Sequence, residues 1–204
     1  PWQILALTFT NKAAREMQTR ISTQVRQQSA SQLWMGTFHS IFCRILRYEA
    51  DRIGFQSDFT IYDAADSKTL ITALIKEMGL DEKLYKPSHV CSQISRAKNA
   101  LVLPSQYSAS AQLRQADNAA RMPMIHEIYA RYYARCRMAN AMDFDDILLY
   151  TWQLLNEHPD VAERYASRFR YVLVDEYQDT NHVQYLLTSL LAGRYENICV
   201  VGDD

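Results

Sequence analysis

The sequence lacks the features that most directly mark a membrane, secreted or metal-binding protein. No apolar run approaches the roughly 18 residues of a membrane-spanning helix, and the N-terminus has no basic segment followed by an apolar one. The four cysteines stand too far apart for a zinc pair or a dense disulfide framework. Basic and acidic residues nearly cancel, with a net charge of −1, so charge alone indicates no nucleic-acid partner. These absences predict a cytoplasmic globular chain whose partners must be inferred from local motifs.

Glycine is scarce as well, and its positions exclude one common motif from the chain. A phosphate-binding loop of the form Gly-x-x-x-x-Gly-Lys-Ser/Thr needs two closely spaced glycines, because backbone amides wrap the phosphates and the lysine reaches them. The five glycines stand at positions 36, 54, 79, 193 and 202, and no two are close enough. These 204 residues therefore contain no such loop.

Both ends of the chain resemble cuts inside a domain. A strand-like apolar segment already begins at Ile4, and the last residues, 198–204, stop at the acidic tip of another. Natural domain boundaries fall in polar linkers, which neither end contains. We expect further sequence on both sides, with any phosphate-binding loop upstream of Pro1.

The apolar residues follow two kinds of pattern along the chain. Continuous apolar segments, typical of parallel strands covered on both faces, lie at 4–9, 33–38, 171–174 and 198–201. Amphipathic helical segments separate them, whereas between about 58 and 140 the spacing is almost entirely helical. We therefore predict an α/β layer formed by residues 1–57 and 141–204 and interrupted by an all-helical insertion over 58–140.

The third apolar segment ends in two adjacent carboxylates, Asp175 and Glu176. Ligands of open parallel sheets bind at the carboxyl ends of the strands, so both acids point toward the expected site. Mg²⁺ prefers oxygen ligands and keeps several waters, so Asp175 can hold it against nucleotide phosphates. Glu176 can orient and deprotonate an attacking water. The same pattern also occurs where an ordinary solvated loop follows a core strand, so longer motifs must decide between the two interpretations.

Such motifs are present, and together they resemble those of one enzyme family. Residues 175–181, Asp-Glu-Tyr-Gln-Asp-Thr-Asn, resemble motif II of the superfamily 1 DNA helicases of the UvrD/Rep/PcrA kind. Residues 8–17 resemble motif Ia, 36–40 resemble motif Ib, 143–146 resemble the point where the chain re-enters the motor domain, and 201–204 resemble the opening of motif III. Because the motifs occur in family order across the whole chain, the chain is identified as a member of this family.

The resemblance implies a fold, cofactors and catalytic roles. The implied fold is the RecA-like parallel sheet of P-loop NTPases, here lacking its first strand, with the helical insertion as subdomain 1B and the rest as motor domain 1A. ATP and Mg²⁺ are the implied cofactors. Asp175 is then the metal ligand, Glu176 activates the water, and Gln178 takes part in cofactor binding.

The resemblance also implies that motifs Ia and Ib contact single-stranded DNA. The residues carried over are Thr8, Phe9, Thr10, Asn11, Lys12, Thr37, Phe38, His39 and Ser40. Aromatic faces stack on bases, and a helix N-terminus beside Lys12 and Arg15 attracts phosphate, although a core position for Phe9 fits the apolar pattern equally well. Basic residues of the insertion could face DNA or simply solvent: Arg96, Lys98, Arg131, Arg135 and Arg137.

We expect the parent protein to unwind DNA with 3′-to-5′ polarity, with single strands and single-strand/duplex junctions as partners and no membrane contact. The chain alone should be inactive, because it lacks the phosphate-binding loop. A missing first strand, central in such sheets, predicts a gap through which the chain could associate with itself. Two alternatives stay open, the motor of a helicase–nuclease subunit of the AddA/RecB kind and a non-catalytic DNA-binding module. The intact pair Asp175 and Glu176 argues against the second.

Overall fold

The computed structural model describes residues 2–25 and 32–203, which form two compact units. The first unit comprises residues 1–53 and 150–204, and the second comprises residues 54–149. Helix α9 (Phe144–Glu157) runs across the boundary in sequence between them. None of the helices in the described part of the chain is long and apolar enough to cross a membrane.

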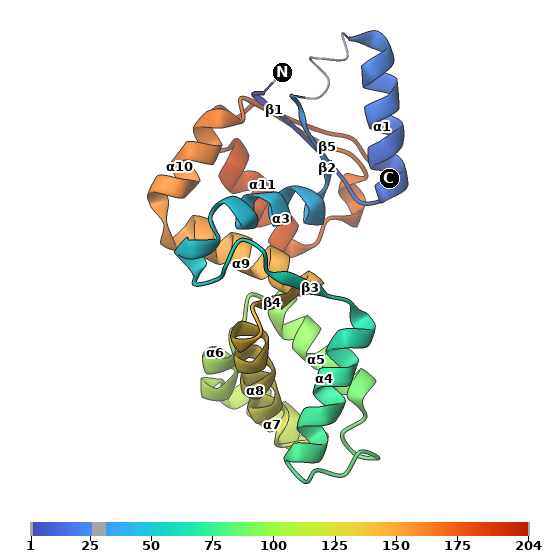
Figure 1. Ribbon diagram of the computed structural model, residues 1–204, viewed down its shortest axis with the longest axis vertical. Coiled ribbons are helices and arrows are strands. Elements are labelled where there is room, and N and C mark those ends of the chain that lie inside the picture. Colours follow the sequence, from blue (N-terminus) through green and yellow to red (C-terminus); the bar gives the residue numbers. More distant parts are fainter. Residues whose placement is uncertain (1, 26–31, 204) are drawn as a thin grey trace. The chain divides into compact units, whose positions relative to one another are not determined.

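The first unit is a parallel sheet with helices on its two sides. Its strands are β1 (Ile4–Thr8), β2 (Trp34–Thr37), β5 (Tyr171–Val174) and β6 (Ile198–Val200). Its helices are α1 (Asn11–Gln24), α3 (Phe38–Tyr48), α10 (Pro159–Arg168) and α11 (His182–Ala192), with short 3-10 helices at Ala50–Ile53 and Tyr177–Asp179. Figure 1 shows α1 on one side of the strands and α3, α10 and α11 gathered on the other.

The four strands pair in the order β2-β1-β5-β6, and all three pairs are parallel. Leu7 lies opposite both Gly36 and Val174, and Val174 also lies opposite Val200. The α/β prediction with its four strands is thereby confirmed. The predicted position of the gap is wrong for the described strands, because β1 pairs directly with β5. The edge strands of this sheet are β2 and β6, and self-association of the chain stays a prediction.

Strand β5 shows which face of the sheet is covered. Val172 and Val174 are each 1% exposed, whereas the alternating residues Tyr171 and Leu173 are 53% and 40% exposed. Because successive side chains of a strand point to opposite faces, one face of β5 packs on the core and the other meets solvent. On the neighbouring strand, Cys199 lies opposite Leu173 and is also exposed, so this uncovered face extends over β5 and β6.

Helix ends follow local sequence signals in some places and depart from them in others. Thr10 caps α1 by accepting a hydrogen bond from the Ala13 N–H at 3.1 Å, a role for which threonine is favoured. Helix α3 ends at Tyr48, well before the next glycine. Gly54 follows the 3-10 helix at Ala50–Ile53 and has a φ of +72°. The sequence signals used above do not predict α10. This helix begins at Pro159, and proline is favoured in the first turn of a helix.

The second unit is mostly helical but contains two short strands. Its elements are β3 (Thr60–Tyr62), α4 (Ala64–Glu77), α5 (Pro87–Asn99), α6 (Pro104–Ala109), α7 (Ala111–Ala119), α8 (Ile125–Met138), β4 (Ala141–Asp143) and the start of α9. Strands β3 and β4 pair in parallel, so this part of the chain is not entirely helical. Its core joins apolar side chains of several helices, among them Leu74, Val90 and Ile128. The unit extends beyond the predicted insertion, 58–140, at both ends.

A charged cluster lies buried in the second unit. Lys98 on α5 is 1% exposed, and its Nζ lies 2.7 Å from a carboxylate oxygen of Asp143 and 2.7 Å from one of Asp146. The Tyr132 hydroxyl donates a hydrogen bond to Asp143 at 2.8 Å, and Asp143 caps α9 by accepting from the Asp146 N–H at 2.9 Å. Burial opposes the charge of Lys98, but the two carboxylates raise its pKa above the usual value. Its side chain is therefore not available for the DNA contact that the sequence allows.

Candidate functional site

The carboxyl ends of the four parallel strands meet at one edge of the sheet. Thr8 at the end of β1 lies opposite Thr37 at the end of β2, and Val174 at the end of β5 lies opposite Val200 at the end of β6. The candidate residues taken from the sequence lie at these strand ends or directly follow them. This is the edge at which open parallel sheets bind their ligands. The fold thus brings together motifs that are far apart in the sequence.

Asp175 and Glu176 follow β5 directly but have different backbone settings. The Asp175 N–H donates a hydrogen bond to the Leu7 carbonyl at 2.9 Å, which continues the pairing of β1 and β5 by one residue. The backbone of Glu176 then enters the left-handed region, with φ 54° and ψ 44°. A non-glycine residue in this region costs about 1–3 kcal/mol and is common at functional sites. The chain therefore turns sharply between a half-buried aspartate and an exposed glutamate.

Gln178 links the Glu176 carboxylate to the segment that follows β6. Its Nε2 donates a hydrogen bond to Oε2 of Glu176 at 2.6 Å, and its Oε1 accepts one from the Asp203 N–H at 3.3 Å. Beside it, the Tyr177 N–H donates to the Val201 carbonyl at 2.9 Å. Gln178 is thus placed to orient Glu176, a geometric role that the sequence motif does not indicate.

The close approach of these segments depends on Gly202. A Cβ atom at this position would overlap Oε1 of Gln178 and would lie 3.3 Å from the backbone nitrogen of Tyr177. A larger residue would therefore displace the Gln178 side chain. The sequence carries a signal for this requirement, because a glycine at a strand end often marks the close approach of another backbone.

The two carboxylates do not form a closed metal site by themselves. In the described part of the chain, no group of three or more histidine, cysteine, aspartate or glutamate side chains could hold a metal ion. Mg²⁺ does not require such a group, because it keeps several waters and is usually bound through one or two carboxylates and substrate phosphates. A half-buried Asp175 at a strand tip, followed directly by the carboxylate of Glu176, fits a Mg²⁺ ion that arrives with a nucleotide.

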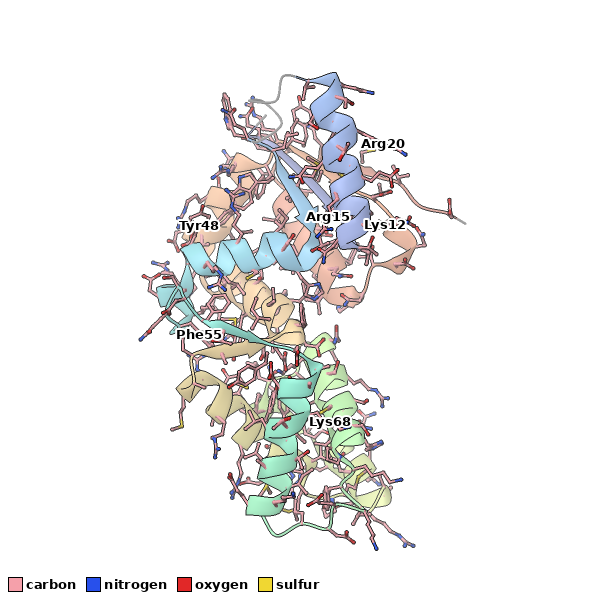
Figure 2. All side chains as sticks on the ribbon, turned by 45° about the vertical axis from the view of Figure 1, so that its right-hand side comes forward. Lys12, Arg15, Arg20, Tyr48, Phe55 and Lys68 are labelled. Carbon is pink, nitrogen blue, oxygen red and sulfur yellow. The ribbon has the colours of Figure 1, made fainter. Side chains whose placement is uncertain are left out.

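The start of α1 forms the second part of this edge. The half-buried ring of Phe9 packs on Phe38, with 5.2 Å between the ring centroids. Amides at a helix N-terminus attract anions, and nearby cations strengthen that attraction. Figure 2 shows Lys12 and Arg15 near this end of the helix. The exposed polar residues of this turn are Thr10, Asn11, Lys12 and Arg15.

Three of the DNA-contact candidates are buried beneath this surface. Thr8, Thr37 and Phe38 are 0%, 8% and 1% exposed. The Thr37 hydroxyl caps α3 by accepting from the Ser40 N–H at 3.2 Å, while no described residue forms a hydrogen bond with the Thr8 hydroxyl. Their side chains therefore shape the site from below. The half-buried His39 and the exposed Ser40 remain accessible on the same segment.

Comparison with known proteins relates the chain to one family. The family model described as UvrD/REP helicase N-terminal domain matches residues 1–204. The chain is 44% identical over 203 residues to the ATP-dependent DNA helicase PcrA of Staphylococcus aureus (strain Mu50). It is 42% identical over 203 residues to the proteins of that name from Bacillus subtilis (strain 168) and Leuconostoc citreum. These matches cover 100% of the chain but only 26% or 27% of each relative.

Proposed function

The chain belongs to the UvrD/REP helicase N-terminal domain family, and on that basis we propose that it is part of an ATP-dependent DNA helicase. The parent protein uses ATP hydrolysis to move 3′ to 5′ along single-stranded DNA and to open the duplex at a junction. We assign the first unit to motor domain 1A and the second to subdomain 1B. The observation that supports this most is the meeting of the carboxylate pair and the start of α1 at one edge of the sheet.

Asp175 and Glu176 have separate roles in this proposal. Asp175 is the metal ligand at the strand tip, and Glu176 accepts a proton from the attacking water. The hydrogen bond from Gln178, at 2.6 Å, orients the Glu176 carboxylate for that task. When bound, Mg²⁺ and ATP supply the reacting phosphoryl group and neutralise charge on its oxygens. Gln178 is accordingly a positioning residue beside the nucleotide.

Single-stranded DNA would lie over the start of α1 and the His39 segment. The Phe9 ring offers a face for a base, while Lys12 and the helix amides attract the phosphates. The buried residues Thr8 and Phe38 support this surface from below. The same edge therefore carries both the proposed nucleotide contacts and the proposed DNA contacts.

We expect the purified 204-residue chain to release no phosphate from ATP above background, with or without single-stranded DNA. The reason is that no phosphate-binding loop is present in it to hold the nucleotide. A continuous phosphate-release assay measures this at ordinary enzyme concentrations. DNA-stimulated release that disappears in the Glu176→Gln chain would contradict the expectation, whereas release that persists in that chain would come from a contaminant.

The proposed DNA surface is tested by the double variant Phe9→Ala/Lys12→Gln. Loss of a stacking face and of one phosphate contact should weaken binding of a labelled oligothymidylate about tenfold or more, as measured by fluorescence anisotropy. The matched control is Tyr185→Ala/Lys83→Gln, which removes an exposed aromatic residue and an exposed lysine elsewhere. Equal affinities of the two double variants would place the DNA elsewhere.

A further inference from the structure

An aromatic and basic surface lies at the opposite edge of the sheet in the first unit. Trp34 begins β2, and Arg168 ends the helix that precedes β5, so both lie at the starts of parallel strands. Arg44 and Tyr48 reach the same place from the last turns of α3. We call these four residues the arginine–aromatic face. The candidate site described above lies at the other ends of these strands, so the two surfaces are separate.

Both arginines of this face are held against one indole ring. The guanidinium carbon of Arg44 lies 4.0 Å from the centroid of Trp34, and that of Arg168 lies 4.7 Å from the same ring. Trp34 itself is 2% exposed and is fixed by edge contacts with Tyr165 and Phe169. A guanidinium that packs on an aromatic ring through its flat face keeps in-plane N–H donors for a second partner. Trp34 therefore holds two guanidinium groups in place, both within 4.7 Å of its ring centroid.

Neither of these guanidinium groups is paired with a carboxylate in the described part of the chain. Among the described residues, neither Arg44 nor Arg168 forms an ion pair within 4.0 Å. The acid nearest in sequence to this end of α3, Glu49, is already engaged. It accepts hydrogen bonds from Arg164 at 2.9 and 3.3 Å and from the Tyr165 hydroxyl at 3.1 Å. Two neighbouring positive charges without a counter-ion favour the binding of an anion.

The surface also offers an exposed aromatic ring. Tyr48 is 62% exposed, although it contacts Trp34 with 6.4 Å between the ring centroids. Its ring also lies 5.9 Å from the Arg44 guanidinium. Figure 2 shows Tyr48 at the end of α3 that is distant from Lys12. An exposed ring beside a cation is suited to a base that is itself joined to a phosphate.

More basic residues continue this surface toward the start of β5. The Tyr195 hydroxyl donates a hydrogen bond to the carbonyl of Ser167, the residue before Arg168, at 3.3 Å. Arg170 lies over the ring of Tyr195, at 5.3 Å from its centroid, and Arg194 lies at 5.7 Å. Hydrogen bonding to Arg170 lowers the pKa of Tyr195. Arg170 and Arg194 thus form a second arginine–aromatic group with Tyr195, in which Arg194 is also paired with Glu163.

We propose that the arginine–aromatic face is a second binding site for single-stranded nucleic acid. Arg44 and Arg168 contact consecutive phosphates, and Tyr48 stacks on a base between or beside them. An acidic peptide would satisfy the two charges but would leave the exposed ring without a flat partner, so a nucleic acid fits better. The ligand class is that of the proposed function, but the surface is different, and the two can fail separately.

The test uses the Phe9→Ala/Lys12→Gln chain, in which the first surface is disabled. This chain should retain a residual affinity for a labelled oligothymidylate. That affinity should fall about tenfold or more when Arg44→Gln/Arg168→Gln is added. The slope of log affinity against log salt should fall by about 1.4, because each single-strand phosphate contributes about 0.7. The control adds Arg114→Gln/Arg121→Gln and should change affinity less than twofold. Both arginines are exposed in the second unit and form no ion pair with a described residue.

A cross-linking measurement needs no substitution and so does not depend on the folding of a variant. An oligonucleotide carrying bromouracil, irradiated on the unmodified chain, should attach to the tryptic peptide 48–52, which begins at Tyr48. Unchanged affinity in the arginine double variant together with no adduct on this peptide would overturn the proposal. So would a loss of polyglutamate binding without a loss of oligothymidylate binding. If the Phe9 and Lys12 changes lower affinity but the arginine changes do not, the proposal is overturned and only the first surface is supported.

Discussion

Replacement of Lys98 by methionine should lower the free energy of unfolding of the second unit by about 3–5 kcal/mol. The substitution keeps most of the apolar stem of the side chain but removes the ammonium that lies 2.7 Å from Asp143 and Asp146. Two carboxyl groups then face each other in the core without a counter-charge. This loss is large because the remaining charges stay desolvated and have no partner. Native-state hydrogen exchange of the α5 and α8 amides measures it for this unit.

The loss should depend on pH in a defined direction. Burial raises the pKa of Asp146 to about 7, even though the Lys98 ammonium lies beside it. Burial also opposes ionisation of Asp143, but the Lys98 ammonium outweighs it and holds the pKa of Asp143 below its usual range. Without Lys98 both carboxyl pKa values rise in the folded state. An acid with a raised folded pKa contributes most below its unfolded pKa, about 3.9, and loses that stability as the pH rises. The difference in the free energy of unfolding between wild type and the Lys98→Met variant should therefore be larger at pH 8 than at pH 5.

Lys68→Met is the matched control, because Lys68 is exposed on α4 (Figure 2). It should change stability by no more than about 0.5 kcal/mol. Addition of Asp146→Leu to Lys98→Met should restore part of the stability, since one unpaired carboxylate is then removed. A difference of roughly 1.4 kcal/mol in the free energy of unfolding corresponds to a tenfold change in the equilibrium constant. If the value for the Lys98→Met chain at pH 8 lay within about 1 kcal/mol of wild type on this scale, the cluster would not stabilise this unit.

Replacement of Glu176 by glutamine should reduce ATP turnover in a full-length protein carrying this chain by about a hundredfold or more. General-base catalysis contributes roughly 10²- to 10⁴-fold, and an amide cannot accept the proton of the attacking water. Nucleotide binding should change little, because Asp175 and the phosphate contacts are retained. Steady-state phosphate release and the binding of a fluorescent nucleotide measure the two quantities separately.

The chain offers a close control for this substitution in Glu196. It is also exposed and its φ is 54°, the same as that of Glu176, so Glu196→Gln reproduces the change in the same backbone region. It should leave turnover unaltered. If the Glu176→Gln protein hydrolysed ATP at nearly the normal rate, water activation would have to be assigned to another residue. Equal losses in both variants would indicate a backbone effect.

Much of the sheet could be predicted because continuous apolar segments specify buried parallel strands with little help from the rest of the chain. The predicted strand at 33–38 contains β2 (Trp34–Thr37), and 171–174 is β5 itself. Strand order could not be read in this way, because pairing between β1 and β5 joins residues separated by more than half of the chain. The helices α6, α7 and α10 escaped prediction because they are short and two of them begin at proline.

The candidate site was predictable in position but not in detail. A strand that ends in Asp175 and Glu176 locates the edge, since parallel strands present their carboxyl ends together. Which candidates are buried was not predictable from motifs, because the burial of Thr8 and Phe38 depends on packing between segments distant in sequence. The burial of Lys98 was likewise not predictable from the sequence. A lysine on an amphipathic helix usually faces solvent, and only its pairing with Asp143 and Asp146 explains its burial.

The two hydrogen bonds of the Gln178 side chain differ in length, so one of them should break more easily than the other. The contact with Glu176, at 2.6 Å, is short, while the contact with the Asp203 N–H, at 3.3 Å, lies beyond the usual range of about 2.7–3.2 Å. A small displacement of the end of β6 would therefore break the long bond first. Gln178 would then move together with Glu176. Gln178 is therefore held more firmly to the Glu176 carboxylate than to the backbone of the segment that follows β6.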